Sequence, residues 1–261
     1  VLVGDLAFGG DDLIVMAGPC AVESRAQIFR VAERVAAAGA TMLRGGAFKT
    51  RTAPGSFAGL GDEGVRLLKE AADSQGLLTV SEIQVPEQID ACRPYIDLFQ
   101  VGSRNMQHIP LLQALGRARV PVLLKRGLAS TIDEWISAAA YIRQEGNDAV
   151  ILCERGIRTF STDTRFTLDV AAIPIARERA GLPVIVDPSH AAGLARWVPS
   201  LALSGVAAGA DGLLVEVHDA PEQALSDGAQ SLDPDAFLAL MQSLQPVASA
   251  LGRRLATEPR R

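Results

Sequence analysis

The sequence has little of several features that would restrict its location or its partners. No apolar run approaches the roughly 20 residues that a membrane-spanning helix needs, and the opening residues, VLVGDLAFGG, lack the basic segment and apolar core of a secretory signal. The formal net charge of −5 argues against nucleic acid or an anionic membrane as the main partner. The three cysteines, Cys20, Cys92 and Cys153, are scattered, which indicates a reducing compartment without a disulfide framework. We therefore expect a cytoplasmic protein that binds neither nucleic acid nor membrane.

Lysine is also scarce. The 25 basic residues include only three lysines, Lys49, Lys69 and Lys125. In a chain so dominated by arginine, a position that retains lysine is a candidate for a role that requires a compact ammonium group.

The chain shows a repeating pattern of a strand followed by a helix. After a short hairpin expected over residues 1–10, eight apolar runs such as LIVMAG, PVLLK and PVIV are each followed by a segment with helical spacing. The runs are apolar throughout, which is typical of parallel strands buried on both faces. Eight such units in about 250 residues favour a (β/α)8 barrel, with a doubly wound open sheet as the alternative.

No linker, low-complexity tract or shift in composition divides the chain. We expect one catalytic barrel domain over residues 1–261, with a frayed tail from about 252 to 261 and no fused regulatory domain. The chain has neither a Walker A loop nor a G-x-G-x-x-G motif after a strand, so a nucleotide cofactor is not indicated.

Each expected strand ends close to a side chain that can take part in chemistry. In chain order these residues are Cys20, Arg44, Glu82, Arg104, Lys125, Arg155, His190 and Glu216. In a barrel, the carboxyl ends of all strands meet on the face where active sites are built. One such residue alone is more typical of a solvated loop, but eight in succession indicate a common site.

Many of these strand ends and the loops after them carry positive charge. The cations are Arg44, Lys49, Arg51, Arg104, Lys125, Arg155 and Arg165. Arginine matches phosphate and carboxylate groups with two parallel hydrogen bonds. The group therefore predicts a small ligand with more than one anionic group.

A second set of side chains combines sulfur, nitrogen and oxygen atoms. It consists of Cys20, His190, Glu216 and Asp227, a mixture typical of divalent Mn, Fe, Co or Zn. The four residues form no local motif, so their pattern alone leaves a metal site and ordinary packing equally open. Cys92 and Cys153 are expected to pack as small apolar residues, and His108 and His218 to lie outside the site.

Eight segments resemble one known family. They are AGPCAVES, RGGAFKTRTAPGSFAGLG, VGSRNMQ, PVLLKRG, ILCERGIRTF, VIVDPSHAAG, GLLVEVH and ALSDGAQSL. In this order they look like 3-deoxy-D-arabino-heptulosonate 7-phosphate (DAHP) synthases of the short type I form, which are related to 3-deoxy-D-manno-octulosonate 8-phosphate synthases. The resemblance extends over nearly the whole chain.

The resemblance implies a transferase, 3-deoxy-7-phosphoheptulonate synthase. Its reaction joins phosphoenolpyruvate, D-erythrose 4-phosphate and water to give DAHP and phosphate, the first step of the shikimate pathway to aromatic amino acids. It implies one divalent metal ion, which is Mn, Fe, Co or Zn, on Cys20, His190, Glu216 and Asp227. The expected partners are the two substrates, further copies of the chain in a homodimer or homotetramer, and a separate regulatory protein such as chorismate mutase.

The resemblance also implies roles for individual residues. The phosphoenolpyruvate site falls on Arg44, Lys49, Glu82, Ser103, Arg104, Lys125 and Arg155. The aldose phosphate falls on Arg51 and Thr52, with Asp187 near its hydroxyl groups or a metal-bound water. We expect Lys49 to give a proton to the new alkoxide and Glu82 to position the water. Together with Asp187 and His190, they form the expected catalytic set.

The chain departs from the family pattern at four positions. Thr50 stands where the family often has proline, Ser103 where it has alanine, and His108 and Phe166 where it has asparagine. The chain lacks the K-A-N-R-S type of loop that octulosonate 8-phosphate synthases carry, which favours the seven-carbon product.

Three alternatives remain at this stage. One is an octulosonate 8-phosphate synthase that uses arabinose 5-phosphate. Another is an aldolase that forms a Schiff base on Lys125. The third is an inactive barrel that serves as a binding partner, which the complete set of cations and ligand residues disfavours.

Overall fold

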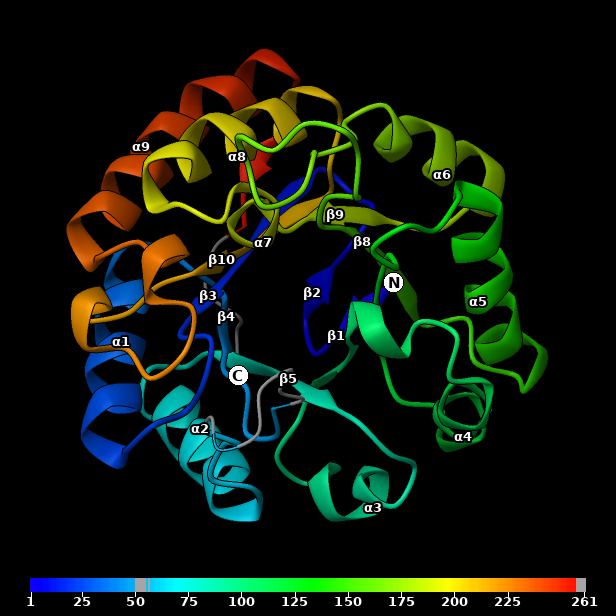
Figure 1. Cartoon of the computed structure of the whole chain (residues 1–261), viewed down its shortest axis with the longest axis horizontal. Helices are drawn as coiled ribbons and strands as arrows, with labels where there is room; N and C mark the ends of the chain where they lie inside the picture. The colour runs from blue at the N-terminus through cyan, green and yellow to red at the C-terminus, as the bar shows by residue number, and fades with distance from the viewer. Residues whose placement is uncertain (50–54, 56, 257–261) are drawn as a thin grey trace.

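The computed structural model describes residues 1–49, 55 and 57–256, and its centre is a closed barrel of parallel strands (Figure 1). The barrel strands are β3 (Asp12–Gly18), β4 (Met42–Arg44), β5 (Leu78–Ile83), β6 (Leu98–Val101), β7 (Val122–Lys125), β8 (Val150–Glu154), β9 (Val184–Val186) and β10 (Gly212–Glu216). Each strand pairs with the next in the chain, and β10 returns to pair with β3. The expected (β/α)8 barrel is confirmed, and the open sheet is excluded.

The helices surround the barrel in a ring, except for the short helix Pro188–Ala192, which lies inside this ring beside β10 (Figure 1). They are α1 (Arg25–Ala37), α2 (Asp62–Ser74), α3 (Gln88–Cys92), α4 (Ile109–Ala118), α5 (Ile132–Gln144), α6 (Ala172–Ala180), α7 (Pro188–Ala192), α8 (Val198–Ala207) and α9 (Pro234–Ala250). The start of α5 shows how local sequence sets these boundaries: Thr131 accepts a hydrogen bond from the backbone of Glu134, whose carboxylate accepts one from the backbone of Thr131. Within the described residues, no helix is long and apolar enough to cross a membrane.

Alternate residues of each barrel strand enter two separate apolar layers. In β3, Leu13 and Val15 pack outward against the helices, whereas Ile14 and Met16 fill the barrel interior. Both faces of the strand are therefore buried, which accounts for the continuous apolar runs in the sequence.

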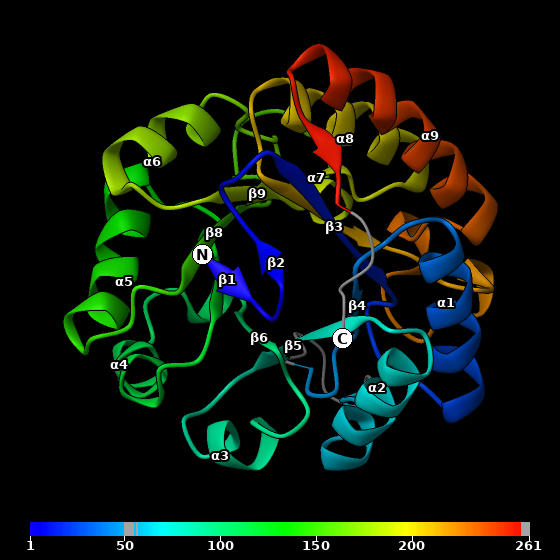
Figure 2. The same ribbon diagram turned by 180° about the vertical axis from the view of Figure 1, so that it is seen from behind.

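The hairpin expected at the N-terminus closes one end of the barrel (Figure 2). It pairs β1 (Leu2–Val3) with β2 (Leu6–Ala7) in antiparallel register. Val3, Leu6 and Phe8 are buried and belong to the same apolar cluster as the barrel interior. The hairpin is therefore part of the core, at the end of the barrel opposite the carboxyl ends of its strands.

The expectation of a frayed tail from residue 252 is wrong for its first part. β11 (Arg254–Leu255) runs parallel to β3 and pairs with Asp12 and Leu13. This position is open because β4 pairs with β3 only at Met16 and Ala17, further along the strand. Arg253 reinforces the arrangement by donating hydrogen bonds to the carbonyl oxygens of residues 10, 12 and 210. Residues 257–261 lie outside the described part of the chain.

Truncation of the hairpin's buried aromatic ring should destabilise the fold. Phe8 is 2 % exposed, so we expect Phe8→Ala to lower the free energy of unfolding by about 3–5 kcal/mol, since it leaves a cavity in the core. Leu2 of the same hairpin is 67 % exposed, and Leu2→Ala should change the free energy of unfolding by less than about 0.5 kcal/mol. Urea unfolding followed by circular dichroism measures both. Equal effects of the two substitutions would contradict the assignment of the hairpin to the core.

Candidate active site

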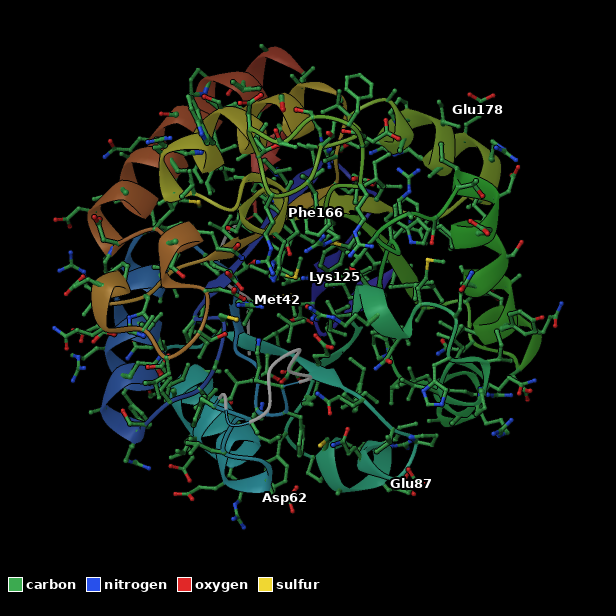
Figure 3. All side chains as sticks on the ribbon, viewed as in Figure 1. Met42, Asp62, Glu87, Lys125, Phe166 and Glu178 are labelled. Carbon is green, nitrogen blue, oxygen red and sulfur yellow. The ribbon has the colours of Figure 1, made fainter. Side chains whose placement is uncertain are left out.

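The carboxyl ends of the barrel strands surround a cavity of about 190 Å³. Lys125 and Phe166, which line this cavity, lie near the centre of the molecule in Figure 3, whereas Asp62, Glu87 and Glu178 lie on its periphery. The cavity is lined by Phe48, Lys49, Glu82, Gly102, Ser103, Arg104, Lys125, Leu128, Arg155, Arg165, Phe166, His190 and Asp227. Side chains that are distant in sequence thus converge at one end of the barrel, as the strand-end pattern predicts.

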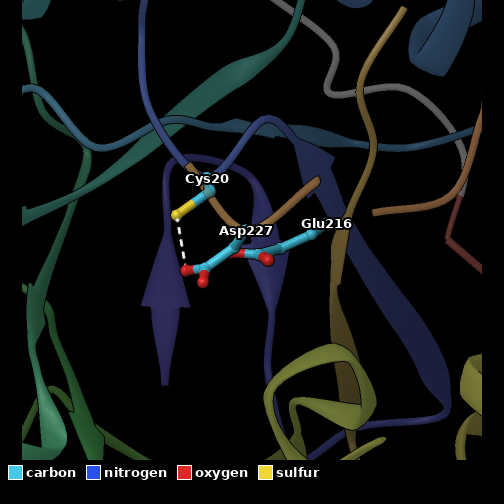
Figure 4. A group of neighbouring side chains, drawn as sticks. All are labelled: Cys20, Glu216 and Asp227. Atoms are coloured by element: carbon cyan, nitrogen blue, oxygen red, sulfur yellow. Dashed lines mark hydrogen bonds between the residues drawn. The ribbon is translucent and has the colours of Figure 1, made fainter. Parts of the chain in front are cut away.

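Three of the expected metal ligands lie together beside this cavity (Figure 4). One potential ligand atom from each of Cys20, Glu216 and Asp227 lies within 4.8 Å of the others. The thiol of Cys20 donates a hydrogen bond of 3.1 Å to Oδ2 of Asp227. Cys20 follows β3, Glu216 ends β10 and Asp227 lies in the loop after β10, so the closure of the barrel brings them together.

The fourth expected ligand, His190, contacts this group at one edge. Its Nε2 atom lies 3.5 Å from Oε1 of Glu216, and its Nδ1 atom lies 2.7 Å from Oδ2 of Asp187. The position of His190 is set by α7, where the carboxylate of Asp187 accepts a hydrogen bond from the His190 backbone. Pro188 begins this short helix, where its missing N–H leaves no donor unpaired.

The protonation states of these side chains suit a divalent cation. Burial lowers the pKa of His190, which favours the neutral imidazole that binds metals. Burial opposes ionisation of Asp227, but the hydrogen bond from Cys20 and the nearby cations outweigh it and hold the pKa of Asp227 at about 2. Burial, assisted by the Glu216 carboxylate, raises the pKa of Cys20 to about 11. A thiol ligand must therefore lose its proton when a metal binds. The closely spaced sulfur and oxygen donors of Cys20, Glu216 and Asp227, with the His190 imidazole at their edge, fit one borderline divalent ion.

Several cations lie among these acidic groups. Arg44 donates a hydrogen bond of 2.8 Å to Oε1 of Glu216, and Lys125 donates one of 2.6 Å to Oδ2 of Asp187. Nζ of Lys49 lies 2.8 Å from the Cys20 sulfur. Arg44, Cys20, Asp187 and Glu216 are buried just beneath the cavity wall, whereas Lys49 and Lys125 line the cavity itself.

Arg155 differs from these paired cations. It is 4 % exposed, and within the described residues its Nε and Nη1 atoms have no hydrogen-bond acceptor. Its guanidinium carbon lies 4.2 Å from the centre of the Phe166 ring. Burial lowers the pKa of Arg155, because a charged guanidinium is less stable away from water.

Glu82, Ser103 and Arg104 form another part of the cavity lining. Oε2 of Glu82 accepts a hydrogen bond of 2.9 Å from the Gln100 side chain. Ser103 and Arg104 lie in a single turn of 3-10 helix directly after β6, and Arg104 is exposed. The structure therefore brings the sequence-predicted residues to one place, except for Arg51 and Thr52, which lie outside the described residues.

Sequence reasoning did not identify several neighbours of this site. Ser226 lies 3.1 Å from the Cys20 sulfur, and Gln230 donates a hydrogen bond of 2.6 Å to Oε2 of Glu216. The phenyl ring of Phe166 lies beneath Arg155, a contact that the departure from the family pattern at this position does not predict. The composition of the loops after β8 and β10 marks them as polar, but it does not say which side chain contacts which partner.

The other histidines and cysteines lie where the sequence suggests. His218 is buried between Glu23 and Asp219, at 3.3 Å from each, and His108 immediately precedes α4. Neither lines the cavity. Cys92 and Cys153 are buried in the apolar core.

Comparisons with known proteins agree with this arrangement. The sequence profile of the DAHP synthetase I family matches residues 3–251. A curated relative from Thermotoga maritima, named phospho-2-dehydro-3-deoxyheptonate aldolase, is 46 % identical over 250 residues, which cover 96 % of this chain and 74 % of the relative. A curated relative from Geobacter sulfurreducens, named 2-dehydro-3-deoxyphosphooctonate aldolase, is 32 % identical to this chain. The aligned region covers 95 % of this chain and 97 % of the relative.

The fold comparison leads to the same family. The crystal structure of the T. maritima DAHP synthase superposes with a TM-score of 0.95 at 45 % identity, covering 98 % of this chain and 75 % of that one. A truncated form of the T. maritima enzyme gives a TM-score of 0.91 at 42 % identity, with 98 % of this chain and 94 % of that one covered. Profile, sequence and fold therefore confirm the predicted class of enzyme, and the chain belongs to the DAHP synthetase I family.

Proposed function

We propose that the protein condenses phosphoenolpyruvate with D-erythrose 4-phosphate and water, with the help of a divalent metal ion, to give DAHP and phosphate. One observation carries the proposal: the Cys20, Glu216 and Asp227 ligand group lies beside a cavity lined by five cations. These cations are Lys49, Arg104, Lys125, Arg155 and Arg165. A ligand with two anionic groups and a carbonyl that needs polarisation suits this combination.

The phosphate and carboxylate of phosphoenolpyruvate would bind to the cationic wall. Arg155 has buried N–H groups that find no acceptor in the part of the chain that the structure describes, and a phosphate oxygen would satisfy them. Lys125 and Arg104 line the same cavity, and Arg44 lies beneath it. Binding to fixed donors holds the enol carbon of the substrate in one orientation toward the second substrate.

The metal would be held by Cys20, His190, Glu216 and Asp227. When bound, it supplies Lewis-acid polarisation of the aldehyde oxygen of erythrose 4-phosphate. Asp187 contacts both Lys125 and His190 and so couples the orientation of the anion site to that of the ligand set. We assign the aldose phosphate to Arg51 and Thr52, on the strength of the family resemblance alone.

The reaction then requires one proton to be delivered and one water molecule to be placed. C3 of phosphoenolpyruvate forms a bond to the aldehyde carbon, and we assign the proton that the new alkoxide takes up to Nζ of Lys49, which lies in the cavity wall beside Cys20. Water adds to C2, and we assign its orientation to Glu82, which lines the cavity. In the resulting hemiketal phosphate, the bond between C2 and the phosphate ester oxygen breaks. Phosphate leaves, the C2 hydroxyl gives up its proton, and C2 becomes a ketone.

We further propose that the enzyme acts in the cytoplasm as a homodimer or homotetramer and is controlled by a separate partner such as chorismate mutase. The scattered cysteines and the net charge of −5 support the location. The oligomeric state and the regulatory partner are assigned on the strength of the family resemblance alone.

An octulosonate 8-phosphate synthase is the second candidate, because relatives of that name are 30–32 % identical to this chain. A Schiff-base aldolase is less well supported, because the ammonium group of Lys125 is engaged by Asp187 at 2.6 Å. Sodium borohydride with substrate should therefore leave no covalent adduct on Lys125.

The two synthase activities can be separated by the choice of co-substrate. We expect phosphate release from phosphoenolpyruvate to proceed with a kcat/KM roughly ten- to a hundred-fold higher with erythrose 4-phosphate than with arabinose 5-phosphate. A colorimetric phosphate assay with each sugar phosphate measures the ratio. A preference for the five-carbon sugar would reverse the assignment.

Metal dependence can be tested at a single cysteine. EDTA should abolish activity, and re-addition of Mn, Fe, Co or Zn singly should restore it with at least one ion. Cys20→Ala should weaken metal binding about 10- to 1,000-fold, because it removes the thiolate ligand. The matched control is Cys92→Ala, since Cys92 is buried away from the cavity. Metal content by mass spectrometry after dialysis gives the result, and equal metal content in both variants would overturn the ligand assignment.

Replacement of Lys49 by methionine tests the assigned proton donor. Lys49→Met keeps much of the side chain's length and apolar volume but removes its donor, so we expect kcat to fall about 10²- to 10⁴-fold. Metal content should stay close to that of the wild type. Near-normal turnover by the variant would reject the role.

A further inference from the structure

Arg155 is an unusual charge for a protein interior. The neighbouring cations have acidic partners: Arg44 pairs with Glu216, Lys125 with Asp187, and Arg126 with Glu154 and Asp169. Arg155 is equally buried but has no ion pair among the described residues, and two of its nitrogens have no acceptor. A buried guanidinium without a carboxylate needs another source of stabilisation to keep a single orientation.

The ring of Phe166 is the group that the guanidinium contacts. The distance of 4.2 Å from the Arg155 guanidinium carbon to the ring centre is typical of a cation–π contact. The Arg165 guanidinium lies 5.9 Å from the same ring. Burial lowers the pKa of Arg155, the Asp187 carboxylate opposes this effect, and the like charge of Arg165 adds to it. The ring thus lies against two cations that repel each other.

The backbone around Phe166 holds the ring in this position. The Phe166 amide donates a hydrogen bond of 2.9 Å to the carbonyl oxygen of Ala191, and its own carbonyl accepts one of 2.9 Å from the Thr164 hydroxyl. Ile157 and Thr167 exchange backbone hydrogen bonds of 2.9 and 3.0 Å in an isolated antiparallel bridge. The loop after β8 therefore folds back so that Phe166 reaches Arg155.

Gly156 makes the close approach possible. Its φ angle is +90°, a conformation that other residues rarely adopt, and a Cβ atom there would lie 2.6 Å from Cβ of Phe166. The residue directly after Arg155 thus has no side chain where the ring passes.

An aromatic ring and a carboxylate would stabilise Arg155 in different ways. A carboxylate would accept the guanidinium's N–H groups and neutralise its charge, as Glu216 does for Arg44. A ring attracts the charge through its face and accepts none of the in-plane N–H groups. With a ring beneath it, the guanidinium keeps both its charge and its donors for a ligand.

We propose that Phe166 is a positioning residue for the phosphate of the substrate: its ring holds the Arg155 guanidinium in place while leaving the N–H donors available to a phosphoryl group. The inference rests on the proposed function only in naming phosphoenolpyruvate as the source of that group. It assigns a role to a side chain at which this chain departs from the family pattern.

The test compares two substitutions at Phe166. Phe166→Leu keeps an apolar side chain but removes the ring, and we expect the Kd for phosphoenolpyruvate, measured by calorimetry on the metal-loaded protein, to rise roughly two- to thirty-fold. Phe166→Tyr keeps the ring and should bind within about twofold of the wild type. The KM for phosphoenolpyruvate should rise in the leucine variant, while the KM for erythrose 4-phosphate and the metal content should stay unchanged.

Two further variants separate this role from a general structural effect. In the background of Arg155→Met, the additional change Phe166→Leu should not weaken binding further, because the group through which Phe166 acts is absent. Phe29, which lies 4.4 Å from Arg25 on α1, is the matched control, since it is also a phenyl ring beneath an arginine but does not line the cavity. Phe29→Leu should leave the Kd for phosphoenolpyruvate unchanged.

The outcomes distinguish the inference from the proposed reaction. If the wild type binds phosphoenolpyruvate but does not condense it, the proposed function fails, whereas weaker binding by Phe166→Leu alone still supports the positioning role. If phosphoenolpyruvate does not bind, inorganic phosphate is the probe, with the same expected order of variants. Unchanged binding in Phe166→Leu, equal losses in the leucine and tyrosine variants, or a full loss that persists in the Arg155→Met background would overturn the inference.

Discussion

The parallel pairing of the first and last barrel strands is the constraint on which the site depends. It places Glu216 opposite Gly18, two residues before Cys20, and the loop after β10 then brings Asp227 to the same point. Gly18 also lies close to β4 on its other side, where a Cβ atom would lie 2.1 Å from the Arg44 carbonyl oxygen. A shift of one residue in this register would turn the Glu216 side chain to the other face of the sheet. The pairing that closes the barrel therefore also brings the ligand group together.

The buried cations at this end of the barrel are stabilised in two different ways. Arg44, Lys125 and Arg126 are buried in ion pairs that fix the strand ends relative to one another. Such pairs contribute more to orientation than to net stability, because burial of both charges offsets most of their attraction. Arg155 instead retains its donors and lies on an aromatic ring. The paired charges form the frame of the site, whereas Arg155 has no ion pair within the described residues.

Much of this arrangement could be predicted from the sequence. Continuous apolar runs and their spacing predict the barrel, and the residue at each strand end predicts which side chains meet, because all parallel strands of a barrel end on one face. Contacts made by loop side chains could not be predicted in this way. Phe166 reaches Arg155 only through the folded-back loop after β8, and β11 pairs with β3 only because β4 leaves part of that edge free. Both depend on three-dimensional positions that have no local sequence pattern.

We propose that one end of the barrel holds a divalent metal ion and a phosphorylated anion side by side. A crystal structure of the protein with manganese and phosphoenolpyruvate, with anomalous diffraction used to locate the metal, tests it most directly. We predict one anomalous peak bounded by Cys20, His190, Glu216 and Asp227, with the substrate phosphate on the Arg155 guanidinium. Manganese bound elsewhere, or phosphoenolpyruvate outside the cavity that Arg155 lines, would contradict the account.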